Sequence, residues 1–476
     1  MIAEGDELCF ASARELASAI RSRKLSAREL MEAHLARVAR LNPQLNAIVA
    51  KLDDEACLKA ADEADDAVAR IDVLGPLHGL PTAFKDTEPA VGFPYTMGST
   101  IFRTFQPPAD SVLIERLRRA GVVPIGKTNV PEFGMGSHTY NSVYGTTRNP
   151  YDLSMSAGGS SGGAAAALAA GMLPIADGSD YGGSLRNPAN FNNVVALRPT
   201  VGLVPGAPST LPFAGYVVKG VLARSVADVG LGLSAVAGID LRDPLSYPTD
   251  PALFAAPLDR DLTGLRVAWC PVPGDLPLDR RVRAVVESCR TTFEDLGCVV
   301  EEAEPPLQGA DEAFLVVRSW SSWHRLGPLL DEHRSEMKPE AVTQIESGAS
   351  LTGHDVAEAM RLHGELLERM RRFHERYDVI VGAVNQVPPF PADIAWPTEI
   401  EGVPMETYLD WMRSACWYSA TFQPALSVPA GFTPEGLPVG IQIAGRRHDD
   451  LLVLHVGHAF EQATGVGQVR PSIALA

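Results

Sequence analysis

Residues 156–188 (SAGGSSGGAAAALAAGMLPIADGSDYGGSLRNP) combine serines with glycines and other small side chains, and they contain no histidine. The glycines before the alanine run leave the first amides of a helix approachable, and the Gly182-Gly183 turn puts backbone N–H groups near Ser184. Such N–H groups could stabilise an oxyanion if Ser184 were a nucleophile. The same pattern also fits a flexible loop before a closely packed helix. If Ser184 is a nucleophile, a residue other than histidine must accept its proton.

Several motifs surround this stretch in a fixed order. Phe84-Lys85-Asp86 comes first, then Ala157–Gly163 with Ser160, then Gly178–Pro188 with Ser184, which lies 24 positions after Ser160. Weaker agreement follows in GKTN, LRPTVG, ARSVAD and GLPVGIQIAG. With these motifs the chain resembles the amidase signature family over nearly its whole length.

The resemblance implies a proton relay without histidine. Ser184 would be the nucleophile, Ser160 the relay, preceded by a cis peptide bond, and Lys85 the final proton acceptor. Lys85 must then be neutral, and burial at the end of the apolar strand PTAF lowers the pKa of a lysine. The resemblance also implies an oxyanion hole from the backbone N–H groups of Tyr181, Gly182 and Gly183, with Asp180 and Arg186 shaping the turn and Ser161 as a hydrogen-bonding loop residue.

Apolar and aromatic residues that could line a substrate pocket are scattered along the chain. A residue of this type lies more often in a protein core than in a pocket. They are Met135, Tyr140, Tyr181, Trp320, Phe390 and Trp411. The resemblance implies neither a metal nor an organic cofactor, and His448, His455 and His458 lack the spacing of a metal site, so we interpret them as structural.

The composition favours a small substrate. The chain has 476 residues, with 41 basic and 58 acidic side chains and a net charge of −17, which disfavours nucleic acid or an anionic membrane as a partner. The N-terminus lacks the pattern of a secretion signal, and the longest apolar run is too short to span a bilayer. Six cysteines without a C-x-x-C pair fit reduced thiols. We therefore expect a cytoplasmic protein, with a homodimer as one possible assembly.

Helix and strand signals alternate through most of the chain. Ser12 with Glu15, and Ser26 with Glu29, are capping boxes that open two helices. Residues from about 305 to 375 carry helical, charged sequence without strand signals. We predict an α/β fold: one domain over residues 1–476, a single large α/β/α sandwich around a mixed, mostly parallel sheet, with residues 305–375 as a helical insert near the active-site mouth.

The motifs favour an amidase that hydrolyses a linear carboxylic acid amide to the acid and ammonia or an amine, through an acyl-serine intermediate. Two alternatives stay open. Gly158–Gly162 matches G-x-S-x-G of an α/β-hydrolase-type esterase, but the residues before it are polar rather than a buried strand. The A subunit of an aminoacyl-tRNA amidotransferase shares the motifs, but this chain departs from its pattern between LRPTVG and ARS, where Val221 follows Gly220.

Overall fold

The computed structural model describes residues 5–70 and 73–475. Both predicted capping boxes form: the Ser12 hydroxyl accepts from Glu15 N–H at the start of α1 (Ala13–Arg21), and the Ser26 hydroxyl accepts from Glu29 N–H at the start of α2 (Ala27–Leu45). Residues 1–4, which contribute to the argument against a secretion signal, lie outside the described residues. No helix in the described ranges has the length and apolar character needed to cross a bilayer.

The strands form a large sheet, a small sheet and a short hairpin. The eight-stranded sheet has the order β4-β6-β5-β12-β13-β9-β7-β8, and the three-stranded sheet has the order β1-β3-β2. The large sheet contains β4 (Ile175–Asp180), β5 (Val195–Arg198), β6 (Val218–Ala223), β7 (Arg266–Trp269), β8 (Val299–Glu302), β9 (Val379–Ala383), β12 (Ala425–Phe432) and β13 (Pro438–Gly445). The small sheet contains β1 (Ile48–Val49), β2 (Pro81–Lys85) and β3 (Val123–Thr128), and the hairpin consists of β10 (Glu399–Ile400) and β11 (Val403–Pro404).

The large sheet is mixed, as predicted, but most of its strand pairs are antiparallel rather than parallel. Only β7 pairs in parallel, with β8 and with β9, whereas the pairs from β4 through β13 to β9 are antiparallel. The helix between β4 and β5 does make these two strands run the same way, but β6 lies between them and is antiparallel to both. A turn at residues 433–437 makes β12 and β13 a hairpin. The alternation of helix and strand signals in the sequence thus predicted the relative direction of β4 and β5, but not which strand pairs with each of them.

Helices cover both faces of this sheet. In β9, Val379 and Val381 belong to one core, which includes Phe460 of α16 (Asp450–Thr464), whereas Ile380 belongs to a second core with Phe314 of α11 (Ala310–Leu326). Because successive residues of a strand face opposite sides, the sheet is buried on both faces, which confirms the sandwich. The remaining helices are α3 (Asp54–Arg70), α4 (Val112–Arg119), α5 (Gly162–Ala169), α6 (Arg186–Phe191), α7 (Val226–Val236), α8 (Ala252–Ala255), α9 (Arg280–Ser288), α10 (Arg290–Asp295), α11 (Ala310–Leu326), α12 (Leu330–His333), α13 (Pro339–Glu346), α14 (Gly353–Phe373), α15 (Arg413–Ala420) and α16 (Asp450–Thr464).

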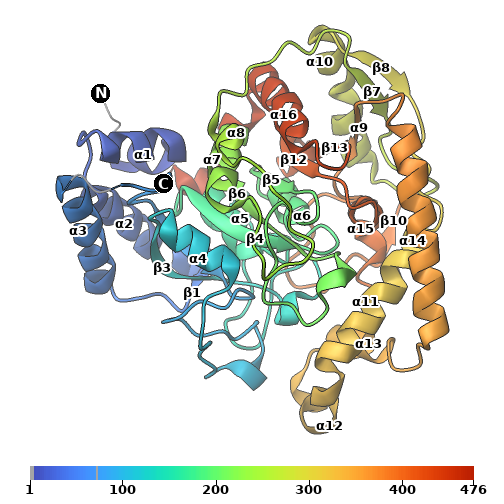
Figure 1. Cartoon of the computed structure of the whole chain (residues 1–476), viewed down its shortest axis with the longest axis horizontal. Coiled ribbons are helices and arrows are strands. Elements are labelled where there is room, and N and C mark those ends of the chain that lie inside the picture. Colours follow the sequence, from blue (N-terminus) through green and yellow to red (C-terminus); the bar gives the residue numbers. More distant parts are fainter. Residues whose placement is uncertain (1–4, 71–72, 476) are drawn as a thin grey trace.

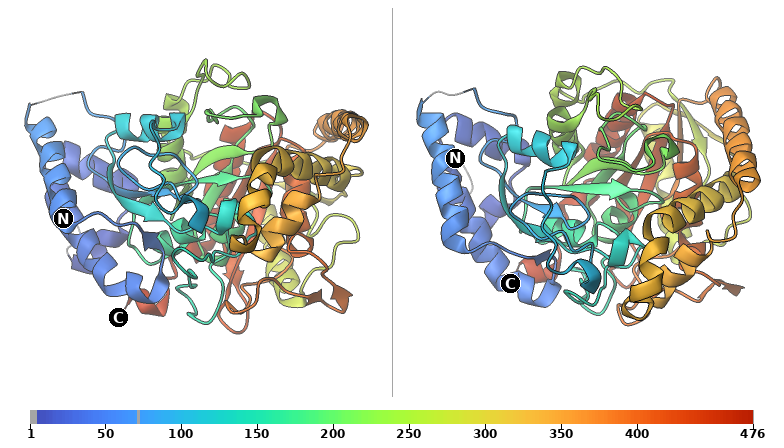
Figure 2. Two further views of the ribbon diagram at one scale, coloured as in Figure 1. Left: turned by 90° about the horizontal axis from the view of Figure 1, so that it is seen from below. Right: turned by 60° about the horizontal axis from the view of Figure 1, so that its bottom comes forward.

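The segment from 305 to 375 is helical and contains α11 to α14. These helices, yellow to orange in Figure 1, lie at the opposite end of the molecule from the blue helices α1, α2 and α3, and both views of Figure 2 show the same separation. The strands that carry the motif residues lie between the two groups. All six cysteines are buried and free of disulfides.

Candidate active site

Lys85 is the last residue of β2, and its side chain is completely buried. β2 lies beside β4: the Thr82 hydroxyl donates to the Ile175 carbonyl at 3.1 Å, and the Lys85 N–H donates to an Asp177 carboxylate oxygen at 3.1 Å. The Lys85 Nζ lies 2.8 Å from Ser160 Oγ. The buried apolar strand therefore delivers one amine to the loop that carries Ser160.

The surroundings of Lys85 weaken its positive charge. Burial lowers the pKa of Lys85 to about 7, although the Glu88 carboxylate acts in the opposite direction and the Lys219 ammonium adds to the lowering. Burial also raises the pKa of the neighbouring Asp177 carboxyl to about 7. A large fraction of the Lys85 amine is consequently neutral near pH 7 and has a lone pair that can accept a proton.

Ser160 lies in the loop before α5, and its peptide bond to Gly159 is cis, as the resemblance implied. The glycines that follow are required by close packing. A Cβ on Gly162 would lie 2.3 Å from the Thr139 hydroxyl oxygen, and one on Gly163 would lie 2.3 Å from the backbone nitrogen of Asn129. The first turn of α5 can therefore press against residues 129–139, which fixes the loop in front of it.

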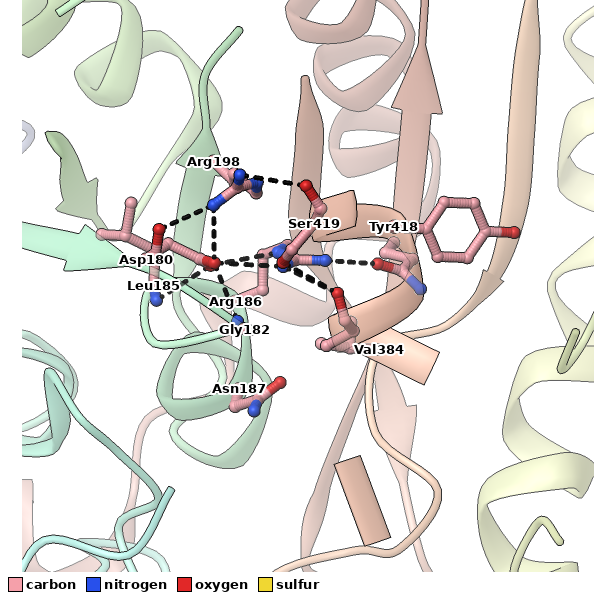
Figure 3. Close-up of polar contacts among 12 residues, drawn as sticks. Asp180, Gly182, Leu185, Arg186, Asn187, Arg198, Val384, Tyr418 and Ser419 are labelled. Atoms are coloured by element: carbon pink, nitrogen blue, oxygen red, sulfur yellow. Dashed lines mark hydrogen bonds and ion pairs between the residues drawn. The ribbon is translucent and has the colours of Figure 1, made fainter. Parts of the chain in front are cut away.

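Ser184 follows a turn that is held by Asp180, the last residue of β4. The Asp180 carboxylate accepts hydrogen bonds from Gly183 N–H at 2.8 Å and from both Arg186 (Nε and Nη2, 3.1 Å each) and Arg198 (3.2 Å). Figure 3 shows the two guanidinium groups converging on this carboxylate. Although burial acts to raise it, these arginines hold the pKa of Asp180 well below its usual range. The predicted turn-shaping contact between Asp180 and Arg186 is present, and Arg198 is an additional partner.

The predicted three-donor oxyanion hole is changed by the same carboxylate. Because the Gly183 N–H donates to Asp180, it is already occupied. The N–H groups of Tyr181 and Gly182 donate to no acceptor within the described ranges, so these two remain candidate oxyanion donors. The Gly183 N–H therefore stabilises the turn through Asp180 and is not available to an oxyanion.

Ser161 and Ser184 are linked through their backbones. The Ser161 N–H donates to the Ser184 carbonyl at 3.2 Å, whereas the Ser161 hydroxyl is buried and has no partner among the described residues. The Ser184 hydroxyl forms no hydrogen bond with any other described residue, and Ser184 lines a cavity. Ser161 therefore acts through its backbone, and the Ser184 hydroxyl is free to meet a ligand.

The cavity at Ser184 has a volume of about 330 Å³, enough for a small molecule. Ser160 and Ser184 both line it, together with Ser179. The rest of its wall comes from Ser111, Tyr181 and α11 and from segments 87–97, 133–135, 201–219 and 242–245. α11 belongs to the helical segment that the sequence predicted near the site.

Of the predicted pocket residues, Met135 and Tyr181 line this cavity and four do not. Phe390 and Trp411 pack edge to face in the second core, with ring centroids 5.2 Å apart. Tyr140 hydrogen-bonds to Glu340 through its phenol. Trp320 also packs against the second core, because it lies about 200° around α11 from the cavity-facing Arg318. These four residues do not line this cavity, because an aromatic residue in a sequence does not show which core or face receives it.

The cavity also contains polar residues that the sequence analysis did not single out. Ser179 Oγ lies 2.9 Å from Lys85 Nζ, so it is a second hydroxyl partner of the amine. Arg318 and Arg325 reach the cavity from α11. Their signal was present in the sequence: Arg318, Ser321, Ser322 and Arg325 are polar at the i, i+3, i+4 and i+7 positions of one helix face.

The geometry around Ser160 differs from that of an α/β-hydrolase. Residues 151–159 form turns and isolated bridges rather than the strand that must precede a nucleophile elbow. His455, a possible base for such a triad, lies in α16 and contacts the carbonyl of Leu258 through Nδ1. The esterase alternative therefore has no support in the structure.

Comparison with known proteins gives one consistent picture. The Amidase family matches residues 29–454. An acylamidase from Rhodococcus erythropolis is 37% identical over 474 residues, which cover 98% of each chain. The A subunit of the glutamyl-tRNA(Gln) amidotransferase of Geobacillus kaustophilus (strain HTA426) is 34% identical, covering 97% of this chain and 98% of the relative. The crystal structure of a bacterial aryl acylamidase belonging to the amidase signature enzymes family is similar with a TM-score of 0.90 and 27% identity, covering 98% of both chains.

Proposed function

Because this chain belongs to the amidase signature family, it is a hydrolase of amide C–N bonds, and we propose that Ser184 is its nucleophile. The observation that carries the assignment is the 2.8 Å contact between the buried Lys85 Nζ and Ser160 Oγ, at the wall of the cavity that Ser184 also lines. A neutral amine, a relaying hydroxyl and an unbonded serine hydroxyl are the parts that nucleophilic catalysis without histidine requires.

In the acylation step, the Ser184 oxygen attacks the amide carbonyl carbon. Its proton passes to Ser160, whose own proton passes to Lys85 Nζ, and the carbonyl oxygen becomes an oxyanion that Tyr181 and Gly182 N–H groups stabilise. Collapse of this intermediate breaks the C–N bond, and the leaving nitrogen takes a proton back along the relay. Ammonia or an amine departs, and an acyl ester on Ser184 remains.

In the deacylation step, the relay takes a proton from water, which attacks the ester carbonyl. Collapse of the second intermediate releases the carboxylic acid and returns a proton to Ser184. Ser179 supports the relay as a second hydrogen-bond partner of Lys85, because its hydroxyl and its carbonyl oxygen lie 2.9 Å and 3.3 Å from Nζ. These contacts hold the amine toward Ser160.

The acyl-enzyme provides a direct test. The protein is incubated with aliphatic, aryl and peptide amides in turn, quenched with acid and analysed by peptide mass spectrometry. We expect the mass of the acyl group on the peptide that contains Ser184, and its loss in Ser184→Ala. The matched control Ser161→Ala should keep the adduct, because the Ser161 hydroxyl has no partner in the described ranges. An acyl group on another residue would contradict the assignment.

The likeness to the amidotransferase A subunit supports a second candidate function, transamidation within a larger assembly. Against it stands the segment between LRPTVG and ARS, in which the sequence departs from the pattern expected of such A subunits. Residues 201–219 contribute much of the cavity wall, including Pro208, Leu211 and Tyr216. A different wall favours a different substrate, and we therefore propose a free-standing amidase that acts on a small-molecule amide.

A further inference from the structure

One face of α11 forms a polar stripe in the cavity wall. Its residues are Arg318, Ser321, Ser322 and Arg325, and every α11 residue that lines the cavity belongs to this set. Seven residues correspond to nearly two helical turns, so Arg318 and Arg325 lie on the same side of α11. The helix thus presents two guanidinium groups to the space beside Ser184.

Arg318 is held in place by neutral partners. Its side chain is buried, its Nε donates to Gln344 Oε1 at 3.1 Å, and its Nη2 donates to the Tyr408 phenol at 2.7 Å. Its guanidinium carbon lies 5.0 Å from the centre of the Tyr181 ring. A guanidinium has five N–H groups, so donors on Nη1 and Nη2 remain for a ligand. The partners fix the orientation of Arg318 without cancelling its charge.

Arg325 adds a second positive charge. Its electrostatic neighbours are the phenols of Tyr95 and Tyr181 and the guanidinium of Arg318, and no carboxylate is among them. Within residues 5–70 and 73–475, neither Arg318 nor Arg325 forms an ion pair. An arginine stays protonated even when burial lowers its pKa. Two uncompensated positive charges therefore face one cavity.

The other cations of the cavity wall are neutralised. Lys219 forms an ion pair with Glu88, and Arg242 pairs with Glu115 at 2.7 Å and with Asp240 at 2.9 Å. In a chain of net charge −17, carboxylates are abundant, yet none is placed beside Arg318 or Arg325 in the part of the chain that the structure describes. Because an unpaired buried charge is costly, the buried Arg318 fits a site at which the ligand brings the anion, and the exposed Arg325 adds a second positive charge on the same helix face.

We propose that Arg318 and Arg325 bind a carboxylate of the substrate, so that the preferred amides are anionic ones. Tyr181 lies between the proposed carboxylate-binding residues and the nucleophile, since its ring contacts Arg318 and it precedes Ser184 by three positions. The substrate class is an amide with a carboxylate on either its acyl or its amine part, held by charge-assisted hydrogen bonds from the guanidinium groups. This inference rests on the proposed function of the Ser184 site.

Matched ligands test the inference by binding rather than turnover. One pair is glutaramate and glutaramide, which share the amide and differ by a carboxylate against a carboxamide. The other is N-acetyl-β-alanine and its amide, in which the charge lies on the amine part. Dissociation constants are measured by calorimetry with Ser184→Ala, which should bind without hydrolysing. We expect the anion of at least one pair to bind at least tenfold more tightly than its neutral partner.

Charge-removing variants assign that preference to α11. Arg325→Gln and Arg318→Gln, each combined with Ser184→Ala, should reduce the preference to within about twofold, with thermal melting confirming that they fold. Arg361→Gln is the matched control. Arg361 lies exposed on α14, where it pairs with Glu358 and Glu365, so its replacement removes one positive charge away from the cavity. It should keep the preference.

Two results would overturn the inference: equal binding of both members in both pairs, or an anion preference that survives in the Arg318 and Arg325 variants. The proposed function fails differently, since it would be contradicted by hydrolysis of these amides in Ser184→Ala. In that event the same ligand pairs, compared as competitive inhibitors, still report the anion preference.

Discussion

At the scale of single residues, Lys85, Ser160 and Ser184 should behave as one unit. If a proton moves along them, removal of any member stops the whole relay, so losses do not add. We predict that Ser184→Ala lowers kcat/KM at least about 1,000-fold, that Lys85→Ala comes within about tenfold of this loss, and that the double variant is no worse than about tenfold below either. Initial rates of ammonia or amine release give the values, and losses that multiply would remove Lys85 from the relay.

The charges around Lys85 make a prediction about pH. Because the pKa of Lys85 is lowered to about 7, kcat/KM should fall as the pH drops below about 7 and protonates the amine. The Glu88 carboxylate raises this pKa and the Lys219 ammonium lowers it. Glu88→Gln should therefore move the acid limb to lower pH, and Lys219→Met should move it to higher pH.

Profiles of kcat/KM between about pH 5 and 9 on a neutral amide measure both shifts. The two variants are controls for each other, since each removes one member of the same ion pair. Shifts in the same direction, or a wild-type profile that is flat across this range, would mean that the fall of kcat/KM at low pH does not result from protonation of Lys85.

The sequence was informative about residues with an unusual local requirement. Lys85, at the end of a buried strand, and Ser160, beside closely packed glycines, could both be singled out from the sequence, because each lies in a short local motif. Gly183 shows the limit: its N–H was expected in the oxyanion hole, but it donates to Asp180. Which acceptor an N–H meets depends on the turn geometry, and the sequence does not contain that information.

At the scale of secondary-structure elements, Asp180 ties β4, α6 and β5 together. Arg198 of β5 donates to both the carbonyl and the carboxylate of Asp180, at 2.6 Å and 3.2 Å, and all these groups are buried (Figure 3). Loss of one partner leaves buried charge and carbonyl groups less satisfied. We predict that Arg198→Met lowers the free energy of unfolding by about 3 kcal/mol.

Thermal melting checks this prediction, with a drop in Tm of several degrees expected. Arg242→Met is the comparison, because Arg242 pairs with the carboxylates of Glu115 and Asp240 but is exposed, and solvent screens its ion pairs. A loss of stability for Arg198→Met no larger than that for Arg242→Met would contradict a structural role for the buried network.

The elements themselves were more predictable than their pairing. β2 ends at Lys85, as the sequence predicted, because the run PTAF is continuously buried. The sheet is mixed, as predicted, but the expectation that most of its strands pair in parallel was wrong. β6 inserts between β4 and β5 after a loop of about 20 residues, and such long-range pairing leaves no periodic signal in either strand. Local patterns specify an element, whereas its neighbours in the sheet are specified by the whole chain.

At the scale of the whole molecule, net charge separates the two candidate functions. A protein that works on tRNA must approach a polyanion, whereas this chain has a net charge of −17. We predict that the purified chain does not retard tRNA in gel-shift experiments at physiological salt. A basic RNA-binding protein is the positive control, and retardation that weakens with added salt would contradict this prediction.

Activity without a partner chain is the corresponding enzymatic prediction. Ser160 and Ser184 line one cavity, whose wall includes α11 and residues 204–219 of the segment between LRPTVG and ARS. The proposed nucleophile, relay and base all come from this chain, so we expect it to bind and attack a small amide without a second protein. We therefore expect the purified protein to release ammonia or an amine from at least one class among aliphatic, aryl and peptide amides, with Ser184→Ala as the inactive control. Size-exclusion chromatography of the active fractions gives the oligomeric state and shows whether the chain forms a homodimer. Hydrolysis that appears only after the other components of an amidotransferase are added would instead favour the partner-dependent function.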